Sequence, residues 1–281
     1  MKWALIGVGH IGTAILEGWI RTGHQAKDVY ISEHTRDKED SLQEKYGVSI
    51  LLEASQLADC ELVLFAVKPQ DLPQIAANFA PDIPSTTLIV SIAAGIDLAS
   101  LSQMLAKSAL SADEYPILRV LPNLPSKVGA GVSVMVANEH VSPDQLEQAK
   151  SIFQNLGLVM ELPEENFAAV TALSGSGPAF VAVFIEALAD AAVYAGLHSQ
   201  AANILAAQTL LGTAKLLLES MTPPAILKNQ VCTAAGTSIY GIRALEKSGF
   251  RASVFDAVIA ASERTEALAL EAADKIKQTG G

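Results

Sequence analysis

The 281-residue chain is predicted to be an α/β protein with two domains: a doubly wound, mostly parallel sheet in residues 1–162 and an all-α domain in residues 163–281. Two features of the sequence predict this division. Up to residue 162, short runs rich in Val, Ile and Leu alternate with longer helical stretches, as in a sheet covered by helices on both faces. After Pro163 the strand pattern ends, and alanine-rich helical stretches follow.

The strands of the first domain are expected at seven nearly continuous apolar runs, which are residues 3–8, 29–32, 62–67, 88–92, 117–121, 132–136 and 158–162. Four segments between these runs are long enough for crossover helices, namely residues 11–21, 71–79, 98–106 and 143–156. Because the runs do not alternate with polar residues, both faces of the sheet are expected to be buried.

The second domain is expected to consist of helices at residues 178–195, 199–220, 237–247 and 254–276, with a short one that begins at residues 222–224. Ser199 can cap the second of these helices. The first helix carries apolar side chains on more than one face, at Phe180, Val183, Phe184, Ala187, Leu188 and Ala191. A helical unit of this size cannot bury so many faces by itself, so we expect a dimerisation domain that packs against a second copy.

Charge and composition exclude several classes of function. The chain has 19 Lys and Arg against 30 Asp and Glu, a net charge of −11, and 5% aromatic residues, which disfavours nucleic-acid binding. Cys60 and Cys232 are expected to be reduced core thiols, and the five histidines lack the spacing of a metal site. The apolar start of the chain ends at residues 9–10, and tract 204–218 is short for a bilayer, so we expect a cytoplasmic protein without a membrane segment.

A glycine-rich motif directly follows the first strand. It is a GxGxxG pattern that opens a helix and consists of Gly7, Val8, Gly9, His10, Ile11 and Gly12. Gly7 suits the tight turn, Gly9 lets the backbone approach a pyrophosphate, and Gly12 lets the helix pack closely on the strand. The helix N-terminus favours bound phosphate. The motif therefore predicts a Rossmann-type dinucleotide-binding domain; the alternative is a glycine-rich turn without a ligand.

The residues after the second strand leave the choice between NADPH and NADH open. Glu33 lies 21 residues after Gly12, near the spacing of the acidic residue that binds an adenosine ribose, which favours NADH. Ser32, Thr35 and Arg36 could instead hold the 2′-phosphate of NADPH, and a solvated loop of mixed charge is a third interpretation. Small-residue turns after later strands can pass under the nicotinamide ribose, at Ala66, Val67, Lys68 and Pro69 and at Ile92, Ala93 and Ala94.

Two stretches of the second domain carry hydroxyl groups. Ser174 and Ser176 lack the flanking glycines of a nucleophile elbow, so hydrolase chemistry is disfavoured. Residues 231–238 form a small loop before a helix, where backbone N–H groups and the hydroxyls of Thr237 and Ser238 suit a small carboxylate. An ordinary helix cap is the alternative. No Lys, His or carboxylate pair stands beside this loop, so the substrate that fits needs little acid–base help, as a protonated imine does.

Six segments spread along the chain carry a family resemblance, namely residues 7–12, 66–69, 91–95, Arg119 with 122–123, 173–179, and 227–241 with 245–246. On these segments the chain resembles the pyrroline-5-carboxylate reductase family over nearly its full length. The resemblance implies reduction of 1-pyrroline-5-carboxylate, a cyclic imino acid, to L-proline with NADPH or NADH, the last step of proline biosynthesis. It also implies a homodimer with an interlocked helical domain, and further assembly into a decamer.

The resemblance also implies roles for individual residues. The cofactor contacts fall on the glycine-rich motif and the strand ends named above, and catalytic roles fall on Thr237 and Ser238. The substrate pocket falls on Glu164, Gln230, Gly236, Thr237 and Ser238. The chain departs from the family pattern in the loop before Thr237, where Ala234 and Ala235 replace proline and glycine, and at Ser238, which replaces threonine.

Two other functions stay open at this point. A β-hydroxyacid dehydrogenase shares the two-domain plan, but the catalytic Lys that such enzymes carry one helical turn beyond the glycine motif has no counterpart in residues 179–184, and the next Lys is Lys215. A divergent paralogue that keeps the dimeric scaffold and nucleotide binding could instead act as a regulatory or interaction protein, as the altered loop at residues 233–238 allows.

Overall fold

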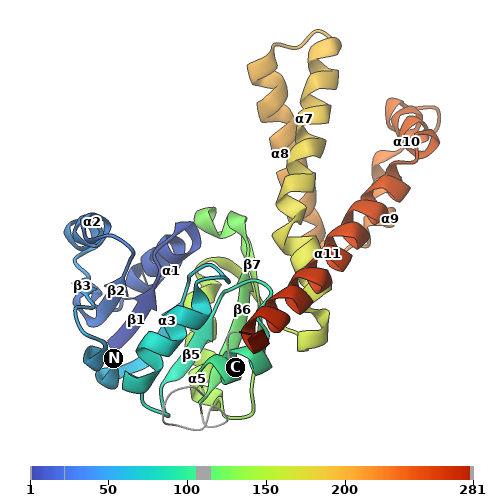
Figure 1. Ribbon diagram of the computed structural model, residues 1–281. Coiled ribbons are helices and arrows are strands. Elements are labelled where there is room, and N and C mark those ends of the chain that lie inside the picture. Colours follow the sequence, from blue (N-terminus) through green and yellow to red (C-terminus); the bar gives the residue numbers. More distant parts are fainter. Residues whose placement is uncertain (1, 22, 106–114, 279–281) are drawn as a thin grey trace. The chain divides into compact units, whose positions relative to one another are not determined.

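The computed structural model describes residues 2–21, 23–105 and 115–278, with side chains up to residue 271 (Figure 1). The chain forms two compact units, which are Met1–Gly175 together with Ser262–Gly281, and Ser176–Ala261. The first unit extends past the predicted boundary at residue 162, because Phe167 is buried against Leu121 and Val134 of the sheet. The assignment of residues 163–281 to one separate domain remains a prediction.

The first unit contains an eight-stranded sheet in the order β3-β2-β1-β4-β5-β6-β7-β8. Its strands are β1 (Lys2–Ile6), β2 (Val29–Ser32), β3 (Ser49–Ile50), β4 (Cys60–Phe65), β5 (Leu88–Ser91), β6 (Ile117–Pro122), β7 (Gly131–Ala137) and β8 (Gly157–Glu161). All neighbouring strands are parallel except β6 and β7, which are antiparallel. The predicted doubly wound, mostly parallel sheet is confirmed; only the two-residue β3 is missing from the prediction.

Five helices connect strands of the described part of this unit, and a sixth follows the last strand. They are α1 (His10–Arg21), α2 (Arg36–Tyr46), α3 (Leu72–Phe79), α4 (Leu98–Leu105), α5 (Pro143–Gln154) and the short α6 (Phe167–Val170). Four of them occur where the sequence predicts crossover helices, except that residue 106 lies outside the described residues. Helix α2 is absent from the prediction, because its sequence is almost entirely polar and only Glu39 and Leu42 are buried.

The sheet has a hydrophobic core on each face, as a doubly wound fold requires. Trp3 and Leu5 of β1 point to one core, which includes Trp19 of α1 and Phe153 of α5. The alternate residues of the same strand point to the other core, which helices α3 and α4 cover. Burial on both faces explains why the strands appear in the sequence as continuous apolar runs.

The second unit is helical. Its elements are α7 (Gly177–Tyr194), α8 (Ser199–Ser220), α9 (Pro224–Val231), α10 (Thr237–Lys247) and the first part of α11 (Phe250–Gln278). Helix α7 packs on α8 through Ala189, Ala202 and Ala206, whose small side chains allow a close approach. The predicted cap at Ser199 is wrong, since His198 is the N-cap residue and Ser199 is already helical.

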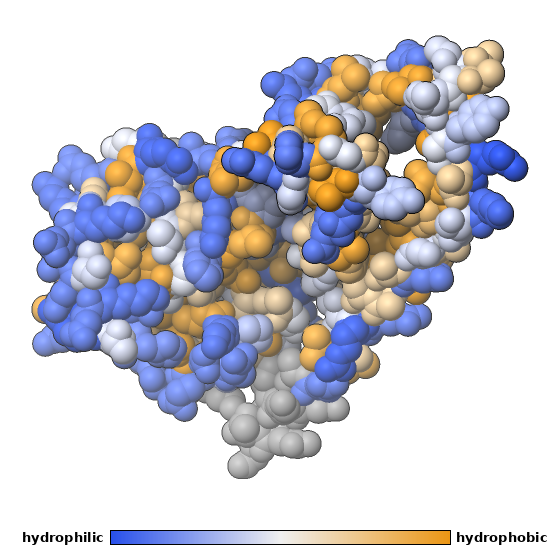
Figure 2. All heavy atoms as spheres, turned by 90° about the horizontal axis from the view of Figure 1, so that it is seen from above, coloured by the Kyte–Doolittle hydropathy of each residue, from blue (hydrophilic) through white to orange (hydrophobic). Residues whose placement is uncertain are grey.

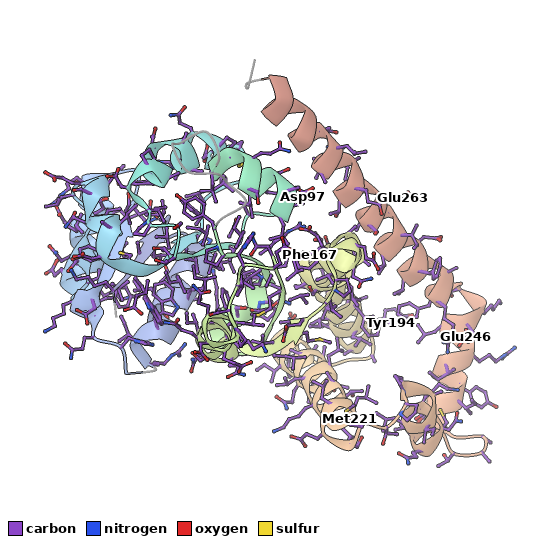
Figure 3. All side chains as sticks on the ribbon, turned by 90° about the horizontal axis from the view of Figure 1, so that it is seen from below. Asp97, Phe167, Tyr194, Met221, Glu246 and Glu263 are labelled. Carbon is purple, nitrogen blue, oxygen red and sulfur yellow. The ribbon has the colours of Figure 1, made fainter. Side chains whose placement is uncertain are left out.

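Many large apolar side chains of the second unit are exposed in the single chain. Val183 is 65% exposed, Leu218 70% and Tyr194 96%, and Figure 2 shows apolar residues, in orange, on the surface of these helices. Tyr194 ends α7 and Met221, 82% exposed, follows α8 (Figure 3). Such faces need a further partner to be covered. The helical part therefore lacks a complete core of its own.

Two helical segments are long and apolar enough to cross a membrane, judged by length and composition alone. They are residues Glu164–Tyr194, with a mean hydropathy of 1.7, and α8, with a mean hydropathy of 1.3. The tract 204–218 lies within the 22-residue α8, so its length does not exclude a span, contrary to the expectation from the sequence. Helices that pack inside an oligomer have the same composition.

Candidate active site

The turns after four strands lie in a row at the carboxyl edge of the sheet. The Gly7 N–H donates to the Ser32 carbonyl at 2.9 Å, and the Ala66 N–H donates to the carbonyl of Ile6, the last residue of β1, at 2.8 Å. The Ile92 N–H donates to the carbonyl of Phe65, the last residue of β4, at 3.1 Å. The strand order reverses between β1 and β4, which is where ligands bind in open α/β sheets. The structure thus brings together the segments predicted to contact the cofactor.

The glycine-rich turn has the form of a phosphate cradle. Gly7 has a φ of +87°, and a Cβ there would lie 2.7 Å from Val67 Cγ1 and 2.8 Å from the Ala66 carbonyl oxygen. A Cβ on Gly12 would lie 2.6 Å from the Gly7 oxygen. A Cβ on Gly9 meets nothing within 4 Å, so space is open beside the N-terminus of α1. These residues fit a dinucleotide, whose pyrophosphate would occupy that space.

Glu33, the residue after β2, holds its carboxylate against this turn. Its Oε1 accepts hydrogen bonds from the Val8 N–H and from Lys38 Nζ, the latter at 2.7 Å, and its Oε2 accepts one from the His34 N–H at 3.1 Å. Burial raises the pKa of Glu33, but these donors outweigh burial and hold the pKa below its ordinary value. The carboxylate is therefore ionised at neutral pH.

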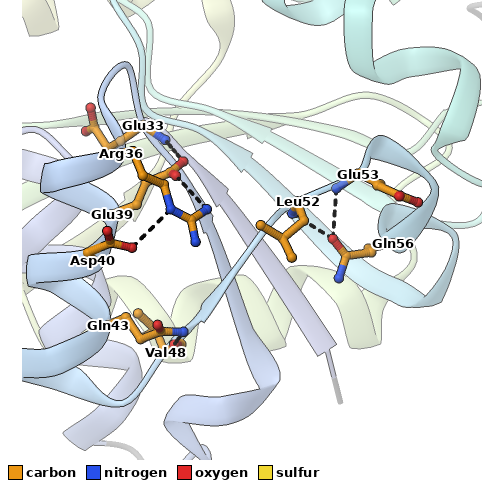
Figure 4. A network of polar contacts seen from close by, with 9 residues as sticks. All are labelled: Glu33, Arg36, Glu39, Asp40, Gln43, Val48, Leu52, Glu53 and Gln56. Atoms are coloured by element: carbon orange, nitrogen blue, oxygen red, sulfur yellow. Dashed lines mark hydrogen bonds and ion pairs between the residues drawn. The ribbon is translucent and has the colours of Figure 1, made fainter.

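The residues predicted to hold a 2′-phosphate lie next to Glu33, between the end of β2 and the start of α2. Arg36 pairs with Asp40 at 3.0 Å and with Glu39 at 3.5 Å, both on its own helix (Figure 4). The Glu33 N–H donates to Glu39 Oε1 at 3.0 Å, which ties the strand end to α2. Thr35 is the N-cap residue of α2 and makes no side-chain cap hydrogen bond. Arg36 is thus already paired with carboxylates three and four residues further along its helix.

The two later turns are small and partly buried. The Lys68 carbonyl accepts hydrogen bonds from the N–H groups of Asp71 and Leu72, at 3.0 and 3.2 Å, so this turn leads directly into α3. Ala93 is buried, and its N–H donates to Ser91 Oγ at 3.3 Å. Both turns follow the carboxyl ends of neighbouring strands, β4 and β5.

Glu164, predicted to bind substrate, pairs with a buried arginine of the sheet. Its Oε1 accepts hydrogen bonds from Arg119 Nη1 at 2.8 Å and from the Leu98 N–H at 2.9 Å. The Arg119 guanidinium carbon lies 4.4 Å from the ring centroid of Phe167, and its Nε is buried without a hydrogen-bond partner. Sequence spacing carries no signal for this ion pair, because the residues are far apart along the chain. A direct contact of Glu164 with substrate stays a prediction.

The loop between α9 and α10 carries the other predicted substrate residues. Gly236 is the N-cap residue of α10, and a Cβ there would meet Thr233 Oγ1 at 2.2 Å. Thr237 and Ser238 occupy the first helical turn, so neither is the N-cap residue. The alternative interpretation of this loop as an ordinary Ser or Thr helix cap is therefore wrong. Because Gly236 has no side chain, no cap side chain accepts a hydrogen bond from the N–H groups of this turn, and N–H groups at a helix N-terminus favour an anion. Gln230 lies in the last turn of α9.

Ser174 is a structural residue. It lies in a π-helical segment, Thr171–Gly175, where its hydroxyl donates to the Val170 carbonyl at 2.9 Å. Its own carbonyl accepts a hydrogen bond from Asn123 Nδ2 at 3.1 Å. Among the residues that the structure describes, no group of three or more His, Cys, Asp or Glu side chains could hold a metal ion.

Comparisons with known proteins identify the family. Residues 164–268 match the family model for pyrroline-5-carboxylate reductase dimerisation, and residues 2–95 match the model described as NADP oxidoreductase, coenzyme F420-dependent. The pyrroline-5-carboxylate reductase of Synechocystis sp. is 41% identical, over 95% of this chain and 98% of that protein. The chain belongs to the pyrroline-5-carboxylate reductase family. The reductase of Escherichia coli is 35% identical, over 95% of this chain and 98% of that protein.

Solved structures of the family agree with this fold. The pyrroline-5-carboxylate reductase from Coxiella burnetii superposes with a TM-score of 0.86 at 31% identity, covering 95% of this chain and 98% of that chain. The Plasmodium falciparum pyrroline carboxylate reductase, solved with NADP bound, gives a TM-score of 0.82 at 28% identity, with 96% and 98% covered. The predicted family and fold class are confirmed. The match to the dimerisation model also accounts for the exposed apolar helices, which an oligomer would cover.

Proposed function

We propose that this chain reduces 1-pyrroline-5-carboxylate to L-proline with NADPH or NADH. The observation that carries the proposal is family membership over nearly the whole chain, together with an open phosphate cradle. A bound reduced nicotinamide supplies a hydride. The imine carbon accepts the hydride, and the electron pair of the C=N bond moves to the nitrogen, which already carries a proton. The products are the secondary amine of L-proline and the oxidised cofactor.

The first unit binds the cofactor in this proposal. The turn from Gly7 to Gly12 and the N-terminus of α1 hold the pyrophosphate. Residues 32–36 hold the adenosine ribose, and the turns at residues 66–69 and 92–94 border the nicotinamide half. Their hydrogen-bonded row along the sheet edge supports this assignment.

The loop before α10 binds the substrate. The N–H groups of the first turn, from Gly236 to Ser238, hold the carboxylate, and the Ser238 hydroxyl accepts a hydrogen bond from the protonated imine nitrogen. Thr237 flanks the same group, and Gln230 and Glu164 are the further substrate-binding residues of the proposal. No general acid is required, so catalysis rests on positioning, which contributes up to about 7–11 kcal/mol for well-oriented reactants.

The chain works as a homodimer, assembled further into a decamer, and it is a cytoplasmic enzyme without a membrane segment. The exposed apolar side chains of α7 and α8 support the dimer, because a second copy would cover them. The dimerisation model matched by residues 164–268 supports the same assembly.

The matched pair Ser238→Ala and Ser248→Ala tests the catalytic role. Ser238 lies in the first turn of α10, whereas Ser248 lies at the other end of that helix. With 1-pyrroline-5-carboxylate and NADPH or NADH, Ser238→Ala should lose at least tenfold in kcat/KM, and Ser248→Ala should keep wild-type turnover. Unchanged turnover of Ser238→Ala would remove this residue from the mechanism. A wild-type chain that binds the cofactor and never turns over would favour a regulatory paralogue.

A further inference from the structure

We propose that Glu33 makes this chain select NADH over NADPH. The inference rests on the proposed function and names the residue that sets cofactor preference. NADH and NADPH differ only at the 2′ position of the adenosine ribose, where NADPH carries a phosphate. The charges that the protein places at that position therefore decide between the two cofactors.

Glu33 is at the ribose end of the site. It follows β2 directly, and the preceding Ser32 accepts the hydrogen bond from Gly7 at the start of the phosphate turn. An acidic side chain at this position binds the ribose hydroxyls in dinucleotide-binding folds. The bond from the Val8 N–H holds the carboxylate against the turn, and only 7% of the side chain is exposed. Glu33 therefore cannot swing away into solvent without losing this bond.

The nearby cations are already neutralised. Lys38 pairs with Glu33 at 2.7 Å, and Arg36 pairs with Asp40 at 3.0 Å (Figure 4 shows the latter pair). From residue 33 to residue 40 the chain has two cationic and four acidic side chains, a net charge of −2. A 2′-phosphate adds a further charge of about −1.5 to −2. It would enter an acidic segment beside a carboxylate, and like charges at such distances repel.

Binding of the 2′-phosphate by Arg36 and Lys38 would break existing ion pairs. Arg36 is 56% exposed and Lys38 is 44% exposed, so both could turn toward a phosphate. Each would then leave its carboxylate partner, and the charged Glu33 carboxylate, with a side chain that is only 7% exposed, would remain next to the phosphate. The ribose hydroxyls of NADH are neutral, and the carboxylate can accept hydrogen bonds from them while Arg36 and Lys38 keep their partners. The carboxylate of Glu33 thus decides which cofactor is preferred.

Direct binding tests this inference without turnover. Calorimetry measures the Kd of NADH and NADPH, and of the fragments ADP and 2′-phospho-ADP, for the wild-type protein, Glu33→Gln and Glu44→Gln. The Glu33→Gln variant keeps a side-chain oxygen that can accept the Val8 N–H bond but loses the charge. Glu44 is an exposed glutamate of α2 and serves as the matched charge control.

We expect the wild type to bind NADH at least tenfold tighter than NADPH, with the same order for the two fragments. Glu33→Gln should reduce that ratio at least fivefold, and Glu44→Gln should change it less than twofold. Equal or tighter binding of NADPH by the wild type, or an unchanged ratio in Glu33→Gln, would overturn the inference alone. Failure of the wild type to bind either dinucleotide would overturn the proposed function as well. Circular dichroism and melting curves confirm that each variant is folded, and Glu33→Ser repeats the test if Glu33→Gln is not.

Discussion

Arg119 and Glu164 form an ion pair, with 2.8 Å between Nη1 and Oε1, that joins strand β6 to the segment leaving the sheet. Arg119 is 8% exposed at its side chain and stacks on Phe167, while Glu164 is 31% exposed. The same carboxylate oxygen accepts the N–H that begins α4, at Leu98. One charge pair therefore joins three elements of the first unit, which are β6, the start of α4 and the segment after β8.

Removing the arginine should destabilise the fold. In Arg119→Met the carboxylate of Glu164 loses its cationic partner, and we expect a loss of about 1–3 kcal/mol in the free energy of unfolding. The value lies below that of fully buried pairs because Glu164 is partly solvated. Urea unfolding measures it, with Asp59→Asn as the control, since Asp59 pairs with Lys2 on the exposed surface. Equal stability of the two variants would contradict a structural role for the buried pair.

Substitutions at Gly9 and Gly7 should affect cofactor affinity and protein stability differently. In Gly9→Ala the new methyl group has open space, so the free energy of unfolding should change by less than about 1 kcal/mol. Under the proposed function this methyl group would lie where the pyrophosphate approaches, so the Kd of NADH and NADPH should rise at least tenfold. Gly7→Ala is the contrasting variant and should lose stability, because its φ is +87° and its Cβ would clash with Val67. Undiminished binding by Gly9→Ala would place the pyrophosphate elsewhere.

The loop before α10 stores backbone strain at Ala235. Its φ is +57°, a left-handed conformation that costs an alanine about 1–2 kcal/mol relative to glycine. Ala235→Gly should therefore raise the free energy of unfolding by about 0.5–1 kcal/mol, after the extra entropy of the unfolded chain is counted. Ala234 has no positive φ, so Ala234→Gly should be neutral or destabilising. A melting temperature that falls in Ala235→Gly would show that this loop is not strained.

The buried thiol of Cys60 should make stability fall at high pH. Burial raises the pKa of Cys60 from 9.0 to about 11, so the folded chain keeps its proton where the unfolded chain has lost it. Above pH 9.0 the unfolded state binds fewer protons, and stability is lost as the pH rises to about 11. We expect the wild type to lose about 1–2 kcal/mol more than Cys60→Ala over this interval in urea unfolding. Parallel curves for the two proteins would contradict the assignment.

Cys232 contrasts with Cys60. The sequence predicts that both thiols lie in the core, but Cys232 is only half-buried in the single chain, whereas Cys60 is 3% exposed. Cys232 is the C-cap residue of α9, and its N–H donates to the Lys228 carbonyl. A cysteine count indicates the redox state of a protein but not the burial of each thiol.

The fold follows from the sequence where burial dictates the pattern. Strand β2 and helix α10 begin and end where the sequence predicts, since an apolar run marks the strand and a glycine on either side marks the helix. Helix α2 is not predictable in this way, because it packs with few apolar residues. The predicted cap of α8 differs from the observed one, His198, by one residue, since Ser199 is the better capping type by sequence alone.

The site follows from the sequence only in part. The glycine-rich turn and the small-residue turns are local patterns, and the parallel sheet brings them to one edge. Some of the hydrogen-bond and ion-pair partners of the charged site residues come from distant parts of the sequence. The bond from Val8 to Glu33 and the pair of Arg119 with Glu164 join residues from different elements, and sequence spacing cannot indicate them.

The formation of L-proline tests the central claim most directly. The purified chain is incubated with 1-pyrroline-5-carboxylate and NADH or NADPH, and chiral chromatography measures L-proline while absorbance measures the oxidised cofactor. We predict one L-proline formed for each cofactor oxidised. Oxidation without L-proline, or no oxidation by a protein that binds the cofactor, would contradict the proposed function.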